Sequence, residues 1–100
     1  MALVIGQATL GTVATILFRE PPGPGVVTLT SDTASTSTCY IGAQPGTATT
    51  AAVTSTNGIP LVPGGAISWA TFDGKGPSVI SGITTASSAS TIGWVISSAG

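Results

Sequence analysis

The chain has 100 residues, a length that supports one compact domain with a single core and is too short for two. Five residues are charged, while Thr, Ser, Gly and Pro together make up half of the chain. Because histidine is absent and cysteine occurs once, the chain lacks the residues of a Ser-His-Asp triad and of a His/Cys metal site. We therefore expect a protein that is not an enzyme and that uses no metal and no cofactor.

The low charge also limits the possible partners. A net charge of −1 with two basic residues provides no basic patch for phosphate groups or for an anionic bilayer. Residues 1–18 are uncharged, but Gln7, Thr9 and Thr12 interrupt the apolar run before it reaches the roughly 20 residues that span a membrane. We expect no contact with nucleic acid and no contact with a membrane, and we interpret residues 1–18 as strand.

Short runs of apolar and β-branched residues recur about every ten residues, which is typical of an all-β sandwich or barrel. The first two runs are residues 2–10 and 13–18, joined at Gly11 and Thr12. A cluster of Pro and Gly at 21–25 then predicts a turn before a strand at 26–30. In that strand Val27 and Leu29 share one face, because successive side chains alternate across a strand.

The middle of the chain contains one further regular strand and two less regular segments. Residues 38–42 form a strand in which Cys39 and Ile41 share a face. The Thr-rich segment 47–56 is consistent with an edge strand or a loosely structured crossing, and Asn57-Gly58 predicts a turn after it. Two prolines make residues 59–63 an extended edge or a covering loop, since proline cannot donate a ladder hydrogen bond.

Three more strands complete the pattern. Residues 66–72 place Ile67 and Trp69 on one face, a loop follows at 73–77, and residues 79–84 form the next strand. In the last strand, residues 91–97, the side chains at 92, 94 and 96 share a face and Val95 lies on the other. We therefore predict one β domain over residues 1–100, a small antiparallel sandwich or barrel of seven or eight strands.

Several polar and aromatic residues allow a functional and a structural interpretation. Arg19 and Glu20 end a strand and are expected to be solvated, with an intersubunit salt bridge as the alternative. Cys39 has no neighbouring cation to activate it, so we expect a buried structural thiol. Trp69 and Trp94 could stack on sugar rings, but each is in phase with Ile neighbours, which favours core or interface packing.

Four segments together resemble a known family. They are residues 6–18 (GQATLGTVATILF), 38–42 (TCYIG), 53–61 (VTSTNGIPL) and 63–67 (PGGAI). The set resembles small structural proteins of tailed bacteriophages, especially of phages that infect actinobacteria. The likeness covers about two-thirds of the chain, and it departs from the family pattern at Cys39, where Val is more usual, and in the charge-poor C-terminal part.

The resemblance implies a non-enzymatic virion protein. From this resemblance we first expect a capsid decoration or cement protein, made in the host cytoplasm and bound to the outer capsid surface. The partner would be the major capsid protein, and the protein would form a homo-oligomer, with a trimer favoured. The alternatives are a tail or fibre component that contacts the host surface, and a carbohydrate-binding module that uses Trp69 or Trp94.

The small number of charges agrees with a protein that stays bound in an assembly, because a domain with few charges has little protection against association. Apolar side chains without alternating polar partners are the best candidates for the contact. The expected assembly interface comprises Leu3, Ile5, Ile59, Pro60, Leu61, Val62 and Pro63.

Overall fold

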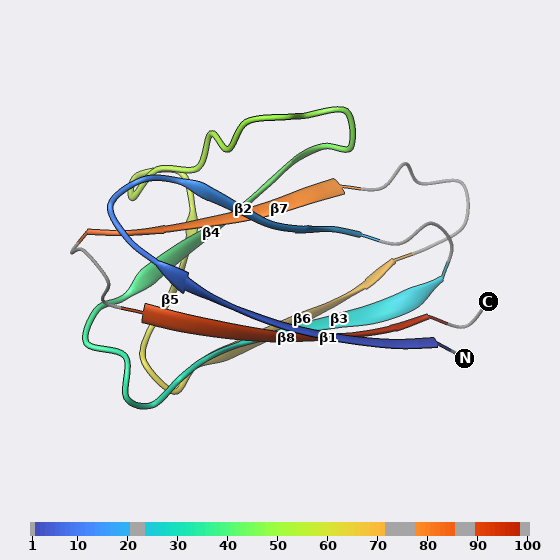
Figure 1. Ribbon diagram of the computed structural model, residues 1–100, viewed down its shortest axis with the longest axis horizontal. Coiled ribbons are helices and arrows are strands. Elements are labelled where there is room, and N and C mark those ends of the chain that lie inside the picture. The colour runs from blue at the N-terminus through green and yellow to red at the C-terminus, as the bar shows by residue number, and fades with distance from the viewer. Residues whose placement is uncertain (1, 21–23, 72–77, 86–89, 99–100) are drawn as a thin grey trace.

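The computed structural model describes residues 2–20, 24–71, 78–85 and 90–98 and shows a β-sandwich (Figure 1). The described residues contain no helix, and thus none that could cross a membrane. The strands are β1 (Ala2–Leu10), β2 (Thr15–Arg19), β3 (Gly25–Ser31), β4 (Cys39–Pro45), β5 (Ile59–Leu61), β6 (Ala66–Thr71), β7 (Ser78–Thr84) and β8 (Ser90–Ser98). The all-β prediction is confirmed, whereas the predicted loop at 73–77 lies outside the described residues.

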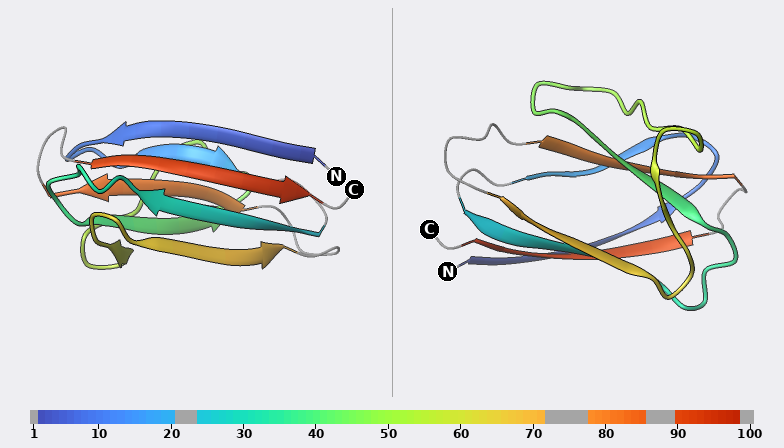
Figure 2. Two further views of the ribbon diagram at one scale, coloured as in Figure 1. Left: turned by 90° about the horizontal axis from the view of Figure 1, so that it is seen from below. Right: turned by 180° about the vertical axis from the view of Figure 1, so that it is seen from behind.

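The eight strands form two antiparallel sheets of four, with the orders β1-β8-β3-β6 and β2-β7-β4-β5. Figure 2 shows the two sheets as separate layers that cross at an angle. The first and last strands pair along their whole length, from Ala2 opposite Ser98 to Leu10 opposite Ser90. β1 and β2 follow each other in the chain but belong to different sheets, because β2 pairs with β7.

The core lies between the sheets and is made by the alternate residues that face inward. Val27 and Leu29 on β3 and Cys39 on β4 are fully buried, and Ile41 is nearly so. These pairs confirm the predicted faces. Burying one apolar side chain of this size contributes about 1.5–3 kcal/mol, so the alternation of a few short strands is enough to hold the two layers together.

Residues 46–58 cover the outer face of the β2-β7-β4-β5 sheet. Val53 packs against Gly42, where an added Cβ would lie 2.8 Å from the Val53 side chain. The Gln44 amide accepts a hydrogen bond from the Ala52 N–H at 2.9 Å and one from the Ser81 hydroxyl at 3.2 Å. As a result β7 is buried on both faces. The segment 47–56 contains no strand, so it is not an edge strand. It is the other form expected from the sequence, a segment that crosses the sheet, and contacts of side chains hold it in place.

Candidate assembly surface

Among the described residues, no segment covers the outer face of the β1-β8-β3-β6 sheet. In each of the four strands, every second residue faces the core and the residues between them point outward. The pairing registers place the four rows of outward residues side by side. These rows contain no charged residue. The outward residues are Leu3, Ile5, Gln7, Thr9, Val26, Thr28, Thr30, Ala66, Ser68, Ala70, Thr91, Gly93, Val95 and Ser97.

Apolar side chains gather on one side of this open face. Leu3 is 61% exposed and Ile5 71%, and Ile5 lies directly opposite Val95, which is itself 41% exposed. Val26 on β3, two strands from β1, is 47% exposed. We call Leu3, Ile5, Val26 and Val95 the apolar strip. An apolar strip on an uncharged sheet face can bury area against a partner without the desolvation cost of charged groups.

A shallow depression of about 570 Å³ lies in the same face. It forms at Gly93, whose missing side chain leaves the space open: an added Cβ would meet one atom within 4 Å, the Gly6 carbonyl oxygen at 3.9 Å. The rim consists of methyl, hydroxyl and amide groups from Ile5, Gln7, Thr28, Thr30 and Val95. The depression can therefore accept a neutral side chain from a partner, and its lining contains no carboxylate, amine, imidazole or thiol.

The residues of the expected assembly interface do not lie together in the structure. Leu3 and Ile5 lie on the open face, whereas residues 59–63 lie at the β5 edge on the opposite side of the sandwich (Figures 1 and 2). Ile59 and Val62 are each 58% exposed, but Leu61 is 3% exposed and belongs to the core. The side chain of Leu61 points between the sheets and neighbours Cys39 across the strand pair, so the single chain does not expose it for contact with a partner.

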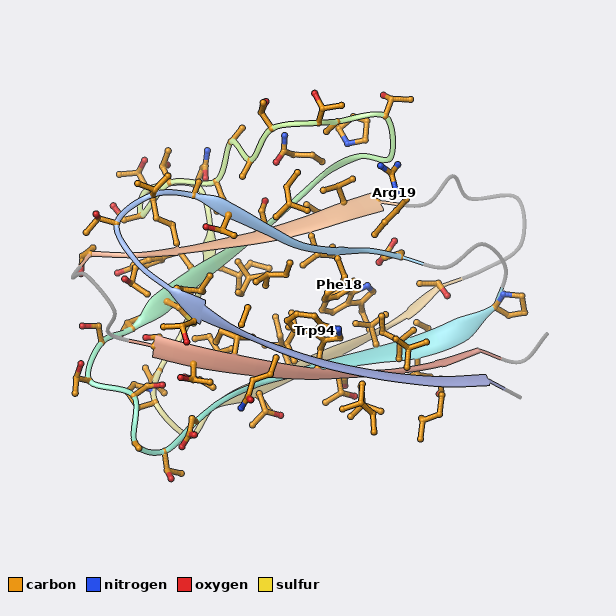
Figure 3. All side chains as sticks on the ribbon, viewed as in Figure 1. Phe18, Arg19 and Trp94 are labelled. Carbon is orange, nitrogen blue, oxygen red and sulfur yellow. The ribbon has the colours of Figure 1, made fainter. Side chains whose placement is uncertain are left out.

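Glu20 corrects one expectation, since it is buried rather than solvated. Its carboxyl accepts a hydrogen bond from the Trp69 indole N–H on β6 and another from the Ser78 N–H on β7, the latter at 3.1 Å. These two strands belong to different sheets. Glu20 is thus a polar link between the layers, whereas Arg19 is exposed and points away from them (Figure 3).

The tryptophans face inward. The rings of Trp94 and Phe18 come from opposite sheets, lie 5.2 Å apart between their centres and point toward each other between the layers (Figure 3). Trp69 and Trp94 are both partly buried and pack against the core. This confirms the expected core packing, and neither ring forms the exposed platform on which a sugar would stack.

Cys39 offers no reactive site. The side chain is fully buried, and its thiol donates a hydrogen bond to the Leu61 carbonyl oxygen at 3.5 Å. Burial raises the pKa of the thiol above its usual value, which lowers the fraction of nucleophilic thiolate. Within the part of the chain that the structure describes, no group of three or more His, Cys, Asp or Glu residues could hold a metal ion.

Comparison of the chain with protein-family models, with curated proteins and with solved structures finds no match. The open face therefore has to be interpreted from its own geometry. The sequence pattern already placed Val95 on the outer side of its strand, but it gave no sign that this sheet and not the other would stay uncovered. Gly93 and Val26 were missed for that reason.

Proposed function

We propose that the protein is a non-enzymatic structural protein of a tailed-bacteriophage virion, a decoration protein that binds the major capsid protein on the outside of the head. The motif resemblance supports the phage context. The observation that carries the binding role is the asymmetry of the sandwich: the chain's own segment 46–58 covers one sheet face, while the other is open and uncharged.

The proposed action is passive. The open face buries its apolar strip and its hydroxyl groups against neighbouring capsid subunits, and the buried contact opposes their separation. An interface of ordinary size takes about 800 Å² from each partner, which is roughly 15% of the 5175 Å² accessible surface of this domain. One sheet face is a suitable source for that area. The inward position of Trp69 and Trp94 disfavours the alternative of a carbohydrate-binding module.

Purified virions test this proposal. We expect the protein to be present at a fixed ratio of hundreds of copies per particle, measured by quantitative mass spectrometry against the major capsid protein. Absence from the particles would contradict a virion role, and a few copies per particle would indicate the tail.

A bulky side chain in the depression tests the face itself. Gly93→Leu should leave the melting temperature nearly unchanged, because the added side chain meets open space. It should nevertheless lower the amount of protein bound to particles at least about tenfold, because the leucine would clash with a capsid surface that fits the depression. Ala52→Leu is the matched control, since Ala52 is exposed on the covering segment at the other face. Equal binding by both variants would exclude this face.

Attachment to particles should depend little on salt. The described outer face has no charged residue, and an exposed charge pair contributes only about 0–1 kcal/mol before screening. We expect the protein to stay on the particles when sodium chloride rises to about 1 M, where the Debye length is roughly 3 Å. Retention is measured on washed, pelleted particles. A steep loss over this range would show that charges of the capsid partner dominate the contact.

A further inference from the structure

The four edge strands of the sandwich differ in how well they are protected against pairing with another chain. An exposed edge is normally blunted by a bulge, a charge, a proline or short length. β2 has a register shift between Ile16 and Phe18 and ends in the charged Arg19. β5 has three residues, of which one is Pro60. Both edges of the β2-β7-β4-β5 sheet are thus protected.

β1 has none of these devices. Its nine residues contain no charge and no proline, and its pairing with β8 runs without a register shift from Ala2 to Leu10. Its other edge faces no described strand, because β1 ends its sheet. At about 3.3 Å per residue the free edge is roughly 30 Å long, close to the 37 Å length of the molecule.

A second observation separates β1 from β6, the other edge of the same sheet. The residues that point outward from β6 are small: Ala66, Ser68 and Ala70. From β1 the exposed apolar Leu3 and Ile5 point outward instead, as part of the apolar strip. The longest unprotected edge is therefore also the edge that is bordered by apolar side chains.

We infer that two copies of the chain pair through β1, edge to edge and antiparallel about a two-fold axis, which extends the sheet from four strands to eight. A two-fold contact places the same surface against itself, so it must be self-complementary. The β1 edge meets this condition. It brings no like charges together, its backbone N–H and C=O groups pair in an antiparallel ladder, and the apolar strips of the two copies become continuous.

This pairing does not depend on the proposed capsid role, and it differs from the trimer expected from the sequence. It uses the backbone edge of β1, whereas attachment to a capsid uses the open face, to which Leu3 and Ile5 also belong. Sedimentation of the purified chain contains no capsid protein, so it tests the pairing separately from attachment.

Sedimentation equilibrium of the purified chain over about 5–500 µM tests the pairing. We expect a reversible association to twice the 9.6 kDa chain mass. The double variant Leu3→Lys/Ile5→Lys should raise the dissociation constant at least about tenfold, because like charges then face each other across the ladder. Val26→Lys, on the same face but two strands from the edge, should leave it nearly unchanged. A monomer throughout, a trimer, or equal effects of both variants would overturn the inference.

Cysteine cross-linking tests the symmetry directly. In a Cys39→Ser background, single cysteines are placed at the outward positions Leu3, Ile5, Gln7 and Thr9. If the two-fold axis passes one of these positions, oxidation should cross-link that single-cysteine protein to itself most efficiently, with lower yields at positions farther from the axis. If the axis passes between two of these positions, a mixture of those two variants should cross-link most efficiently. If β1 instead pairs with β6 of the next copy, these variants would not cross-link with one another, a β1 cysteine would cross-link with a cysteine on the outward side of β6 such as Ser68→Cys, and the two-fold arrangement would be wrong.

Discussion

Replacing Trp94 with alanine is expected to lower the free energy of unfolding by about 3–5 kcal/mol. The indole fills the space between the sheets, where it packs against Phe18 and lies over Gly6. An added Cβ at Gly6 would lie 2.3 Å from the indole ring, so the ring occupies the space that a side chain at position 6 would need. For a domain of this size the expected loss is a large part of the total stability.

Urea unfolding followed by circular dichroism measures this loss. Val95→Ala is the matched control, because Val95 is the next residue of β8 and points to the open face. It should lower the free energy of unfolding by less than about 1 kcal/mol. Equal midpoints for the Trp94→Ala protein and the wild type would show that the ring does not hold the layers together.

The second large effect is expected from Glu20→Ala, which should cost about 2–3 kcal/mol of stability. The substitution removes the acceptor of the Trp69 indole N–H and of the Ser78 N–H, and both residues are partly buried. A donor that loses its partner in a place that water reaches poorly costs part or all of its desolvation penalty. Thermal unfolding and urea unfolding should both report the loss.

Asp32→Ala controls for the removal of a carboxylate. Asp32 also accepts a backbone hydrogen bond, from the Ala34 N–H at 2.9 Å, but it is exposed, so water can replace it. Its loss should cost less than about 1 kcal/mol of stability.

A double-mutant cycle tests the link itself. Trp69→Phe should lower the stability less in the Glu20→Ala protein than in the wild type, because the effects of substitutions at contacting residues are not additive. Additive effects of the two substitutions would contradict the link between the sheets.

The strand pattern could be predicted because it depends on local alternation. The period of two placed residues 2–10 in one strand and put Val27 with Leu29, and Cys39 with Ile41, on buried faces. The assignment of strands to sheets could not be predicted in this way. Residues Gly11 and Thr12 were expected only to join two strands, and nothing local shows that the chain crosses there from one sheet to the other.

The burial of Glu20 and the burial of Leu61 could not be predicted from the sequence for the same physical reason. A charged residue next to Arg19 and two prolines looks solvated in the sequence, and its burial depends on Trp69 and Ser78, which are 49 and 58 residues away. Leu61 sits among exposed apolar neighbours, and its inward direction is fixed by pairing with Cys39. The open face likewise follows from the packing of Val53 on Gly42, a contact that covers one sheet and leaves the other free.

The pairing of the first strand with the last sets the order of events during synthesis. Ala2 and its partner Ser98 are 96 residues apart in the chain, so β8 is synthesised long after β1. Until then β1 lacks β8, and β3 lacks the same neighbour on one side, so the sheet cannot close. The apolar residues of β1 and β3 therefore remain without this partner in the nascent chain, and contacts between residues so far apart in the sequence form slowly. Closure of this sheet is therefore expected only after β8 has been made, and protection by chaperones matters most before that point.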